Sequence, residues 1–242
     1  MALHFLAPAS TDAEVGETVV LTGAEAKHAA VVRRVRVGET VTIGDGSGVW
    51  LTGTVEDVSA SQVTVRVTER RTHEPPSSRI LLAQALAKGD RDELAVQAAC
   101  ELGVDGIIPW QAARSVSRWE GAKAAKGRER WAAIVREAAK QAHRAWVPDV
   151  TEVHSTAQLA ARAQAERMLV LDPTAEHRLT GIRPDGRDVL LVVGPEGGIA
   201  PEELARLEEA GAERVRLGDT VLRTSTAGPA AIAVLSGILG RW

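Results

Sequence analysis

The sequence has few of the residues that build several common kinds of site. It has one cysteine, Cys100, which excludes an internal disulfide and a zinc cluster built on cysteines. It has no tyrosine and one phenylalanine, so alanine, valine and leucine must fill the core. No run of about 18 apolar residues occurs, and the N-terminus lacks the basic-then-apolar pattern of a signal peptide. We therefore expect a cytoplasmic protein with no membrane segment.

A large excess of one charge is also absent, because the formal net charge is −3 over 242 residues. Overall charge therefore neither requires nor excludes a nucleic-acid partner. From Arg114 to Arg144, however, nine lysine and arginine residues stand against three acidic ones. Trp119, Trp131 and Trp146 lie in or beside this stretch. A cationic surface with stacking rings is typical of sites for looped RNA, although a solvated helix face has the same composition.

The pattern of apolar residues changes at residues 72–79, which contain two prolines and no face that a fold would bury. We place the domain boundary here, between residues 1–72 and 73–242. The first part is expected to hold a helix at 24–35 and strands at 18–21, 40–43, 49–58 and 62–69. Short strands with regular turns favour a small barrel.

Strands and helices alternate after residue 79, which predicts a parallel sheet with covered faces. Strands are expected at 80–87, 106–110, 168–171, 189–193 and 214–217. Helices are expected at 91–102, 123–146, 156–167, 201–210 and about 229–239.

The strand at 189–193 runs into the loop Gly-Pro-Glu-Gly-Gly of residues 194–198. In an open α/β sheet, ligands bind beyond the carboxyl ends of strands, and glycines let the backbone approach them closely. The loop lacks the glycine patterns that bind dinucleotides and phosphates, and a tight turn is the alternative interpretation. The helix dipole should keep Glu196 ionised, which suits hydrogen bonding to a ligand better than action as a strong base.

Residues 217–227, Leu-Gly-Asp-Thr-Val-Leu-Arg-Thr-Ser-Thr-Ala, form a second candidate segment. Arg223 stands there beside three hydroxyl residues. The alternative is that residues 224–226 cap the last helix, with Pro229 at its first position. That helix is rich in alanine and glycine, which implies close packing against another backbone or subunit.

These two segments together resemble the RsmE family, the uridine-N3 methyltransferases of 16S ribosomal RNA in the SPOUT superfamily. The resemblance covers nearly the whole chain. It includes Lys88-Gly89-Asp90, Glu101-Leu102-Gly103-Val104, and Arg144 with Val147-Pro148. His28, Val32 and Arg34 resemble an N-terminal segment of the family, although Arg33 stands where the family pattern has leucine.

The resemblance implies an α/β fold of the SPOUT type in residues 73–242, with a parallel sheet and a deep C-terminal trefoil knot. It implies a small PUA-like RNA-binding β-barrel in residues 1–72. The residue pattern alone does not predict the knot, because threaded chains are almost absent among folds. The resemblance further implies S-adenosylmethionine as cofactor, a homodimer with the site near the subunit interface, and 16S ribosomal RNA of the small subunit as partner. It implies no metal.

Three loops are implied to bind the cofactor. Their residues are Leu171, Gly194, Pro195, Glu196, Gly197, Gly198, Ile199, Leu217, Gly218, Leu222, Thr224 and Ala227. The residues expected to bind RNA are His28, Arg33, Arg34, Lys88, Arg114, Arg136, Gln141 and Arg144.

Uracil N3 is a poor nucleophile until it loses its proton, and attack of its anion on a sulfonium neutralises charge. An arginine beside the uracil carbonyls would stabilise that anion. The candidates are Arg223 and Arg114, and Arg114 in one arrangement reaches across the dimer. Glu196 is a third catalytic candidate by position, as a weak base. Ser225, where many relatives have glutamate, is assigned no catalytic part.

Three other functions stay open. One is another SPOUT enzyme that methylates a transfer RNA or a ribose hydroxyl. The second is an RNA-binding or ribosome-assembly protein without catalysis. The third, a nucleotide-dependent α/β enzyme, is disfavoured because the phosphate-binding motifs are missing.

Overall fold

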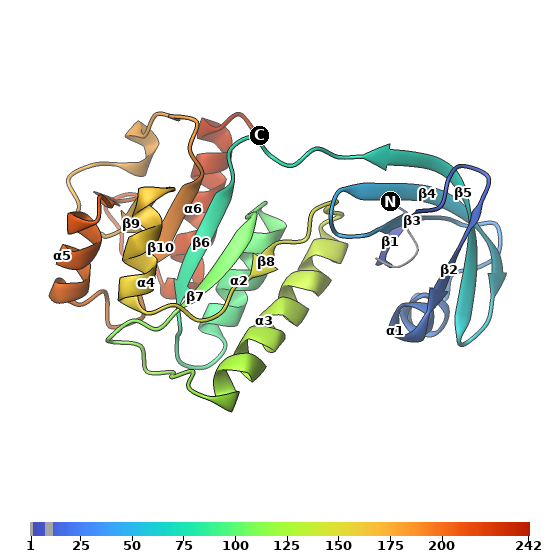
Figure 1. Ribbon diagram of the computed structural model, residues 1–242, viewed down its shortest axis with the longest axis horizontal. Helices are drawn as coiled ribbons and strands as arrows, with labels where there is room; N and C mark the ends of the chain where they lie inside the picture. The colour runs from blue at the N-terminus through green and yellow to red at the C-terminus, as the bar shows by residue number, and fades with distance from the viewer. Residues whose placement is uncertain (1, 8–11) are drawn as a thin grey trace. The chain divides into compact units, whose positions relative to one another are not determined.

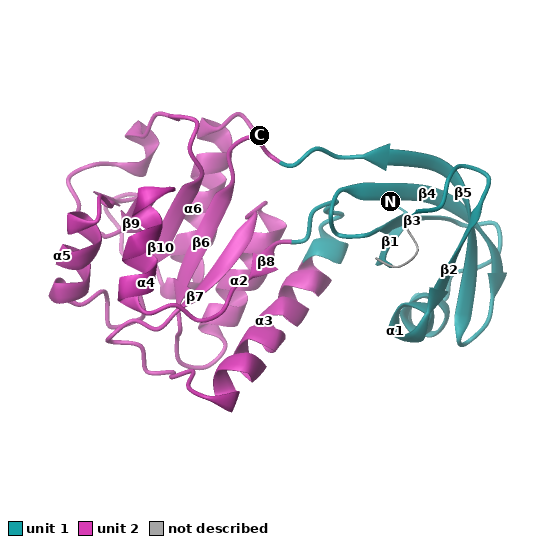
Figure 2. Cartoon of the chain, viewed as in Figure 1, with its two compact units in different colours: residues 1–75, 139–147 teal, residues 76–138, 148–242 magenta. Residues whose placement is uncertain are grey.

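The computed structural model describes residues 2–7 and 12–242, which form two compact units (Figures 1 and 2). The first unit combines residues 1–75 with residues 139–147, and the second combines residues 76–138 with 148–242. The sequence predicts one boundary after residue 72, with residues 139–147 in the second domain. In the structure this segment packs in the first unit, where Lys140 Nζ lies 2.9 Å from Glu25 Oε1 and the Val147 N–H donates to the Gly46 carbonyl.

The first unit is built on a five-stranded curled sheet of order β1-β3-β4-β5-β2. The strands are β1 (Leu3–Leu6), β2 (Thr18–Thr22), β3 (Thr40–Gly44), β4 (Val49–Val58) and β5 (Gln62–Thr72). β1 pairs with β3 in parallel, and the other pairs are antiparallel. Alternate residues of β5 such as Val63, Val65 and Val67 are buried, so one face of the sheet covers a core.

The helix expected at residues 24–35 is shorter in the structure. An α-helix, α1 (Gly23–Lys27), continues as a π-helical turn, His28–Val32. β-branched Val31 and Val32 lower helix propensity, and Arg34 adopts a left-handed conformation with φ of 54° that ends the helix.

The second unit has a six-stranded parallel sheet of order β11-β9-β10-β6-β7-β8, as predicted for the region after residue 79. Its strands are β6 (Ile80–Ala85), β7 (Gly106–Trp110), β8 (Asp149–Val150), β9 (Arg167–Leu171), β10 (Val189–Val193) and β11 (Glu213–Val215). Its helices are α2 (Arg91–Glu101), α4 (Thr156–Ala161), α5 (Pro201–Glu209) and α6 (Thr224–Ile238), with 3-10 turns at Arg162–Gln164 and Leu179–Gly181. All residues of β6 and β10 are buried, which explains their unbroken apolar pattern.

α3 (Ala122–Gln141) runs from the second unit into the first (Figure 2). It ends earlier than the predicted residue 146, because His143 has a φ of 53° that no α-helix accommodates. The short strands β1 and β8 were not predicted.

α6 begins at Thr224, so the prediction that Pro229 opens this helix is wrong. Arg223 is its extended N-cap residue, and no side chain caps it. Gly228 lies so close to β6 that a Cβ there would come within 3.1 Å of Leu82 Cδ1. The small residues of α6 therefore serve close packing within the second unit, where α6 contacts α2, β6 and β10.

Candidate active site

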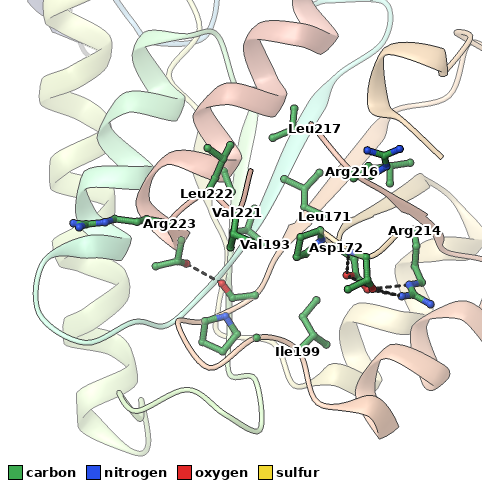
Figure 3. A pocket seen from close by; sticks show the side chains of 18 of the residues that line it. Leu171, Asp172, Val193, Ile199, Arg214, Arg216, Leu217, Val221, Leu222 and Arg223 are labelled. Carbon is green, nitrogen blue, oxygen red and sulfur yellow. Dashed lines mark hydrogen bonds and ion pairs between the residues drawn. The ribbon is translucent and has the colours of Figure 1, made fainter. Parts of the chain in front are cut away.

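A cavity of about 760 Å³ lies at the carboxyl ends of β9, β10 and β11 (Figure 3). Three loops that follow these strands form it, as expected for a ligand site of a parallel sheet. Of the residues predicted to bind a cofactor, the cavity is lined by Leu171, Gly194, Pro195, Glu196, Gly198, Ile199, Leu217, Gly218, Leu222, Thr224 and Ala227. Gly197 is not part of the lining, although both of its neighbours are. The cofactor role of these residues stays a prediction.

Several residues that line the cavity were not predicted. Among them are Arg91, Asp172, Pro173, Thr174, Val193, Pro201, Leu204, Arg214, Val215, Arg216, Thr220 and Val221. Asp172 directly follows β9, so its place at a strand end was a signal that pointed to it. Arg91 and Arg214 come from α2 and β11, and no sequence signal assigned either residue to the site.

Two of the loops are joined by one buried chain of hydrogen bonds. Thr224 Oγ1 donates to the Gly194 carbonyl at 2.8 Å. Gln84, which is fully buried in β6, donates from Nε2 to Thr224 Oγ1 at 2.9 Å. A Cβ at position 194 would lie 2.7 Å from Ile199 Cγ1, so only glycine fits where the loop turns back. The loop therefore has a defined shape before any ligand arrives.

Glu196 fastens the glycine loop to the segment that precedes α2. Its Oε1 accepts hydrogen bonds from the Lys88 N–H and from Arg91 Nη1, both at 2.9 Å. Partial burial, the largest influence, would raise the pKa of this carboxyl. The backbone hydrogen bonds and Arg91 together outweigh burial and hold that pKa below its ordinary value. Glu196 is thus ionised and engaged, which makes it a poor proton acceptor.

A second carboxylate, Asp172, stands in the cavity wall beside Arg214 (Figure 3). Arg214 Nη2 lies 2.7 Å from Asp172 Oδ2, and the Thr174 N–H donates to Oδ1 at 2.8 Å. Burial acts to raise the pKa of Asp172, but the bonds from Thr174 and Arg214 lower it overall. The wall therefore carries a negative charge that Thr174 and Arg214 already hold in place.

Arg114, predicted to act in catalysis and RNA binding, lies against the glycine loop. Its Nη1 donates to the Gly197 carbonyl at 3.0 Å. The preceding residue is anchored, because the Ala113 N–H donates at 2.9 Å to Oε1 of the buried Glu203 of α5. Thr156 donates to the same oxygen at 2.6 Å. Arg114 thus supports the outer side of the cavity.

Arg223, the other arginine predicted to be catalytic, borders the cavity at the start of α6. Within residues 2–7 and 12–242 its guanidinium makes no hydrogen bond or ion pair, and in Figure 3 it extends away from the other labelled side chains. Val221 and Leu222 precede it, and Val221 is 79% exposed. Arg223 therefore has its donors available for a substrate.

The residues predicted to bind RNA are divided between the units. The first unit holds His28, Arg33, Arg34, Gln141 and Arg144, and the second holds Lys88, Arg114 and Arg136. Arg33, Arg34, Lys88 and Gln141 are exposed, whereas the other side chains of the first unit's set are half-buried. His28 Nδ1 lies 3.3 Å from Lys140 Nζ, so part of its hydrogen-bonding capacity is used inside the unit.

The tryptophans of the basic stretch do not form the expected stacking surface. Trp119 and Trp131 are buried and pack edge to face, with ring centroids 5.0 Å apart. Trp146 donates from Nε1 to the His73 carbonyl at 3.0 Å. The expectation was wrong for both rings: Trp131 lies on the buried face of α3, and Trp119, which precedes α3, packs against it.

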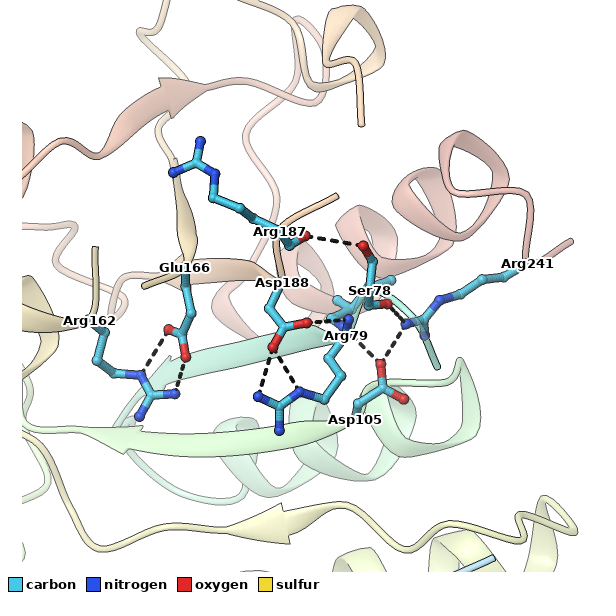
Figure 4. A network of polar contacts seen from close by, with 9 residues as sticks. Ser78, Arg79, Asp105, Arg162, Glu166, Arg187, Asp188 and Arg241 are labelled. Carbon is cyan, nitrogen blue, oxygen red and sulfur yellow. Dashed lines mark hydrogen bonds and ion pairs between the residues drawn. The ribbon is translucent and has the colours of Figure 1, made fainter. Parts of the chain in front are cut away.

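A network of polar contacts lies at the amino ends of the strands, opposite the cavity (Figure 4). Arg241, which follows α6, lies 2.7 Å from Asp105 Oδ2 and also donates to the Ser78 carbonyl. The same Asp105 oxygen accepts the Ile80 N–H at 2.8 Å. Arg79 pairs with Asp188 beside it. These contacts fasten the C-terminal segment to the starts of β6 and β10.

The described residues include no group of three or more histidine, cysteine, aspartate or glutamate side chains placed to hold a metal ion. None of the helices among them combines the length and apolar character needed to cross a membrane.

Comparisons with known proteins agree with this architecture. A family model described as an RNA methyltransferase domain matches residues 73–236, and one described as an RNA methyltransferase PUA domain matches residues 21–68. Ribosomal RNA small subunit methyltransferase E of Mycobacterium tuberculosis is 44% identical over 95% of this chain and 90% of its own length. The protein of that name from Bacillus subtilis is 34% identical over 98% and 96%.

A crystal structure of ribosomal RNA small subunit methyltransferase E from Neisseria gonorrhoeae, bound to S-adenosyl methionine, superposes with a TM-score of 0.89 at 30% identity. The match covers 98% of each chain. The predicted SPOUT-type α/β fold with an N-terminal PUA domain is thus confirmed, while the knot stays a prediction. The family recognised from the two glycine-containing motifs is confirmed as well: the chain belongs to the RNA methyltransferase family that includes ribosomal RNA small subunit methyltransferase E.

Proposed function

We propose that this protein transfers the methyl group of S-adenosylmethionine to N3 of a uridine in 16S ribosomal RNA. One observation carries the proposal: the three segments that resemble the family's cofactor loops lie around a single cavity at the carboxyl ends of β9, β10 and β11. Relatives that carry the name of a small-subunit ribosomal RNA methyltransferase match almost the full length of the chain.

The residues of the cavity fit S-adenosylmethionine. Its volume of about 760 Å³ suits a ligand of that size. Leu171, Ile199 and Leu217 offer an apolar surface for a purine, while the glycine loop offers backbone groups for polar atoms. The ionised Asp172 supplies an acceptor for hydroxyl or ammonium groups. When bound, the cofactor supplies an electrophilic methyl group on a positively charged sulfur.

We assign Arg223 the task of stabilising the uracil anion, because its guanidinium is unengaged and lies at the cavity's edge. Arg114 is assigned a supporting role at the glycine loop, through its bond to the Gly197 carbonyl. Glu196 serves to hold the loop and the cofactor in place, since its lowered pKa opposes proton abstraction. The apolar part of the lining, with Leu171, Ile199 and Leu217, is assigned the task of keeping water from the reacting atoms, which favours a step in which opposite charges cancel.

The remaining parts of the proposal concern organisation. We infer that residues 1–72 bind RNA and that residues 73–242 carry the chemistry, in line with the two family models. We infer a homodimer with the site near the subunit interface, which the exposed Val221 and Leu222 beside the cavity support. A C-terminal knot is in keeping with the close contact of Gly228 and β6. The compartment proposed is the cytoplasm.

Transfer of labelled methyl groups tests the function. Purified protein is incubated with methyl-labelled S-adenosylmethionine in three separate reactions. One contains 16S ribosomal RNA, one contains small ribosomal subunits and one contains transfer RNA. Label in N3-methyluridine of 16S RNA is the expected result. Label in transfer RNA or in a ribose would indicate a different SPOUT enzyme, and cofactor binding without any transfer would indicate a non-catalytic assembly factor.

A further inference from the structure

A second cavity, of about 320 Å³, lies wholly within the first unit. It is formed by β4, the end of β5 and the segment around His143. Trp50 and Arg71 are direct cross-strand neighbours there, as are Thr52 and Glu69. None of its residues lines the larger cavity, and none is among those predicted to bind RNA.

Four aromatic rings gather at this cavity. The His4 ring stacks on Trp50, with centroids 4.1 Å apart and planes 4° from parallel. His73 stands edge-on to Trp50 at 6.2 Å, and His143 is tilted at 6.3 Å. Trp50, His73 and His143 border the cavity, whereas His4 lies buried behind Trp50. His4 therefore supports one face of the Trp50 indole from the interior, and the indole borders the cavity.

The His4 ring that supports Trp50 is a neutral imidazole. His4 is 6% exposed, and its Nδ1 lies 3.0 Å from Thr42 Oγ1. Burial, followed by the nearby His143 and Lys140, lowers the pKa of His4 to about 3. A neutral ring stacks on the indole without introducing a charge that would need solvent. The Trp50 side chain is thus held in one orientation at neutral pH.

The walls of the cavity are also fixed before any ligand arrives. The Gly48 N–H donates to the Ala145 carbonyl, and the His73 N–H donates to the Gly48 carbonyl. A Cβ on Gly48 would come within 2.8 Å of the Trp146 ring, so glycine is required for this approach. His143 is held at a φ of 53°, a conformation that is costly for a residue with a side chain. Preorganisation of this kind lowers the entropy cost of binding.

The polar rim has both a donor and an acceptor. Arg71 Nη2 lies 2.6 Å from Glu69 Oε1, and their side chains are 65% and 46% exposed. The carboxylate disfavours a site for phosphate alone. A planar base, however, stacks on aromatic rings and exchanges hydrogen bonds along its edge with groups of both kinds.

We propose that this cavity binds one unpaired nucleobase of the RNA substrate, packed against Trp50 and the two bordering histidines and hydrogen-bonded at its edge by Arg71 and Glu69. The proposal rests on the proposed function, which supplies RNA as the ligand. It adds a contact point on the first unit that is separate from the base to be methylated. Its role is to anchor the RNA, so its loss weakens RNA binding and leaves cofactor binding intact.

The experiment measures the affinity of the full-length protein for 16S ribosomal RNA transcript by filter binding. Trp50→Ala is expected to weaken binding about tenfold, the usual effect of removing one stacking ring. Arg71→Ala is expected to weaken it by several-fold. Arg66→Ala is the matched control, because Arg66 lies on the same strand and pairs with Glu56 but does not border the cavity. Arg66→Ala should change the affinity for RNA by less than about twofold.

Titration with S-adenosylmethionine accompanies each variant and should give unchanged affinity. If the wild-type protein binds RNA but transfers no methyl group, the proposed function fails. The RNA affinities of the variants still test the base-binding cavity in that case. If the wild-type protein methylates RNA and the Trp50 and Arg71 variants bind RNA as tightly as it does, the subsite is refuted. An equal loss in Arg66→Ala refutes it too, because general charge would then explain the effect.

Photo-crosslinking covers the case in which Trp50→Ala fails to fold. Wild-type protein is irradiated with 16S transcripts that carry 4-thiouridine or 6-thioguanosine, and crosslinked peptides are mapped by mass spectrometry. Crosslinks at Trp50, His73 or His143 support the subsite. Crosslinks confined to other parts of the chain overturn it.

Discussion

Thr224 Oγ1 donates a 2.8 Å hydrogen bond to the Gly194 carbonyl, and so joins the start of α6 to the loop after β10. Gln84 fixes the same hydroxyl from the centre of the sheet. The two segments by which the family was recognised therefore meet at one buried contact. The shape of the cavity depends on this link, since both loops contribute to its lining.

We expect Thr224→Val to reduce the affinity for S-adenosylmethionine by about tenfold. The change keeps the side chain's shape and removes one hydrogen bond, worth about 1 kcal/mol, while it leaves a buried carbonyl and amide without their partner. Calorimetric titration measures the effect. Thr226→Val is the control, because the Thr226 hydroxyl bonds only to the exposed turn at Arg223. Equal affinity in wild type and Thr224→Val would show that the link does not shape the site.

Arg223→Ala should lower the single-turnover methylation rate by about a hundredfold, because it removes the group assigned to stabilise the uracil anion. Affinity for S-adenosylmethionine should not change, and Arg223→Lys should recover part of the rate. Arg206→Ala, an exposed arginine of α5 outside the cavity lining, is the matched control. A full rate in Arg223→Ala would remove Arg223 from the mechanism.

Glu196→Gln should keep the methylation rate within about tenfold of wild type and weaken the binding of S-adenosylmethionine. Because the pKa of Glu196 is lowered and its Oε1 already accepts two hydrogen bonds, the carboxylate is a weak proton acceptor and its loss should change the chemical step little. Arg91→Met should weaken binding similarly, and the double variant should be no worse than either, since both break one contact. A hundredfold slower rate with unchanged cofactor affinity would instead identify Glu196 as the base.

His4 should make the stability of the protein depend on pH. Its pKa is about 3 in the folded protein and 6.5 in the unfolded chain. As pH falls below 6.5 the unfolded chain takes up a proton that the folded protein does not, so the free energy of unfolding decreases by about 1.4 kcal/mol per pH unit. This stability is fully present above pH 6.5 and is lost progressively toward pH 3.

Urea unfolding at pH 7, 5.5 and 4.5 tests this dependence. His4→Phe, which keeps a ring on Trp50, should lose about 2–3 kcal/mol less than wild type between pH 7 and 4.5. His177→Asn, at an exposed histidine, should follow the wild-type curve. The same pH slope in wild type and His4→Phe would show that His4 is not the group responsible.

Arg241→Leu should lower the free energy of unfolding by about 2 kcal/mol, because it removes the 2.7 Å ion pair to the nearly buried Asp105. Affinity for S-adenosylmethionine should not change, since the contact lies at the strand ends opposite the cavity. Arg187→Leu, which breaks an exposed pair with Asp185, should cost below about 1 kcal/mol. Thermal and urea unfolding measure both. Equal stability of Arg241→Leu and wild type would contradict this role.

The sequence predicted the parts of the fold that depend on local pattern. β10 and β7 have the predicted bounds because each is a short apolar run ended by loop residues. The start of α6 was missed because proline suits a first helical position, whereas here a contact between Gly228 and Leu82, far apart in the chain, sets the packing. Local rules cannot see such a contact.

The same reason explains which site residues were found. The loop residues carried recognisable motifs, whereas Gln84 reaches Thr224 across 140 positions of sequence. The aromatic cluster at Trp50 depends on His4 of β1, a strand that was not predicted. The expected stacking surface was wrong because composition shows that Trp119 and Trp131 are present but not that both rings are buried.

The most direct test is to map modified nucleosides in 16S ribosomal RNA from cells that lack this protein. We predict that one N3-methyluridine disappears, that the wild-type protein restores it, and that the Arg223→Ala protein does not. An unchanged set of N3-methyluridines in the deletion strain would contradict the proposed function.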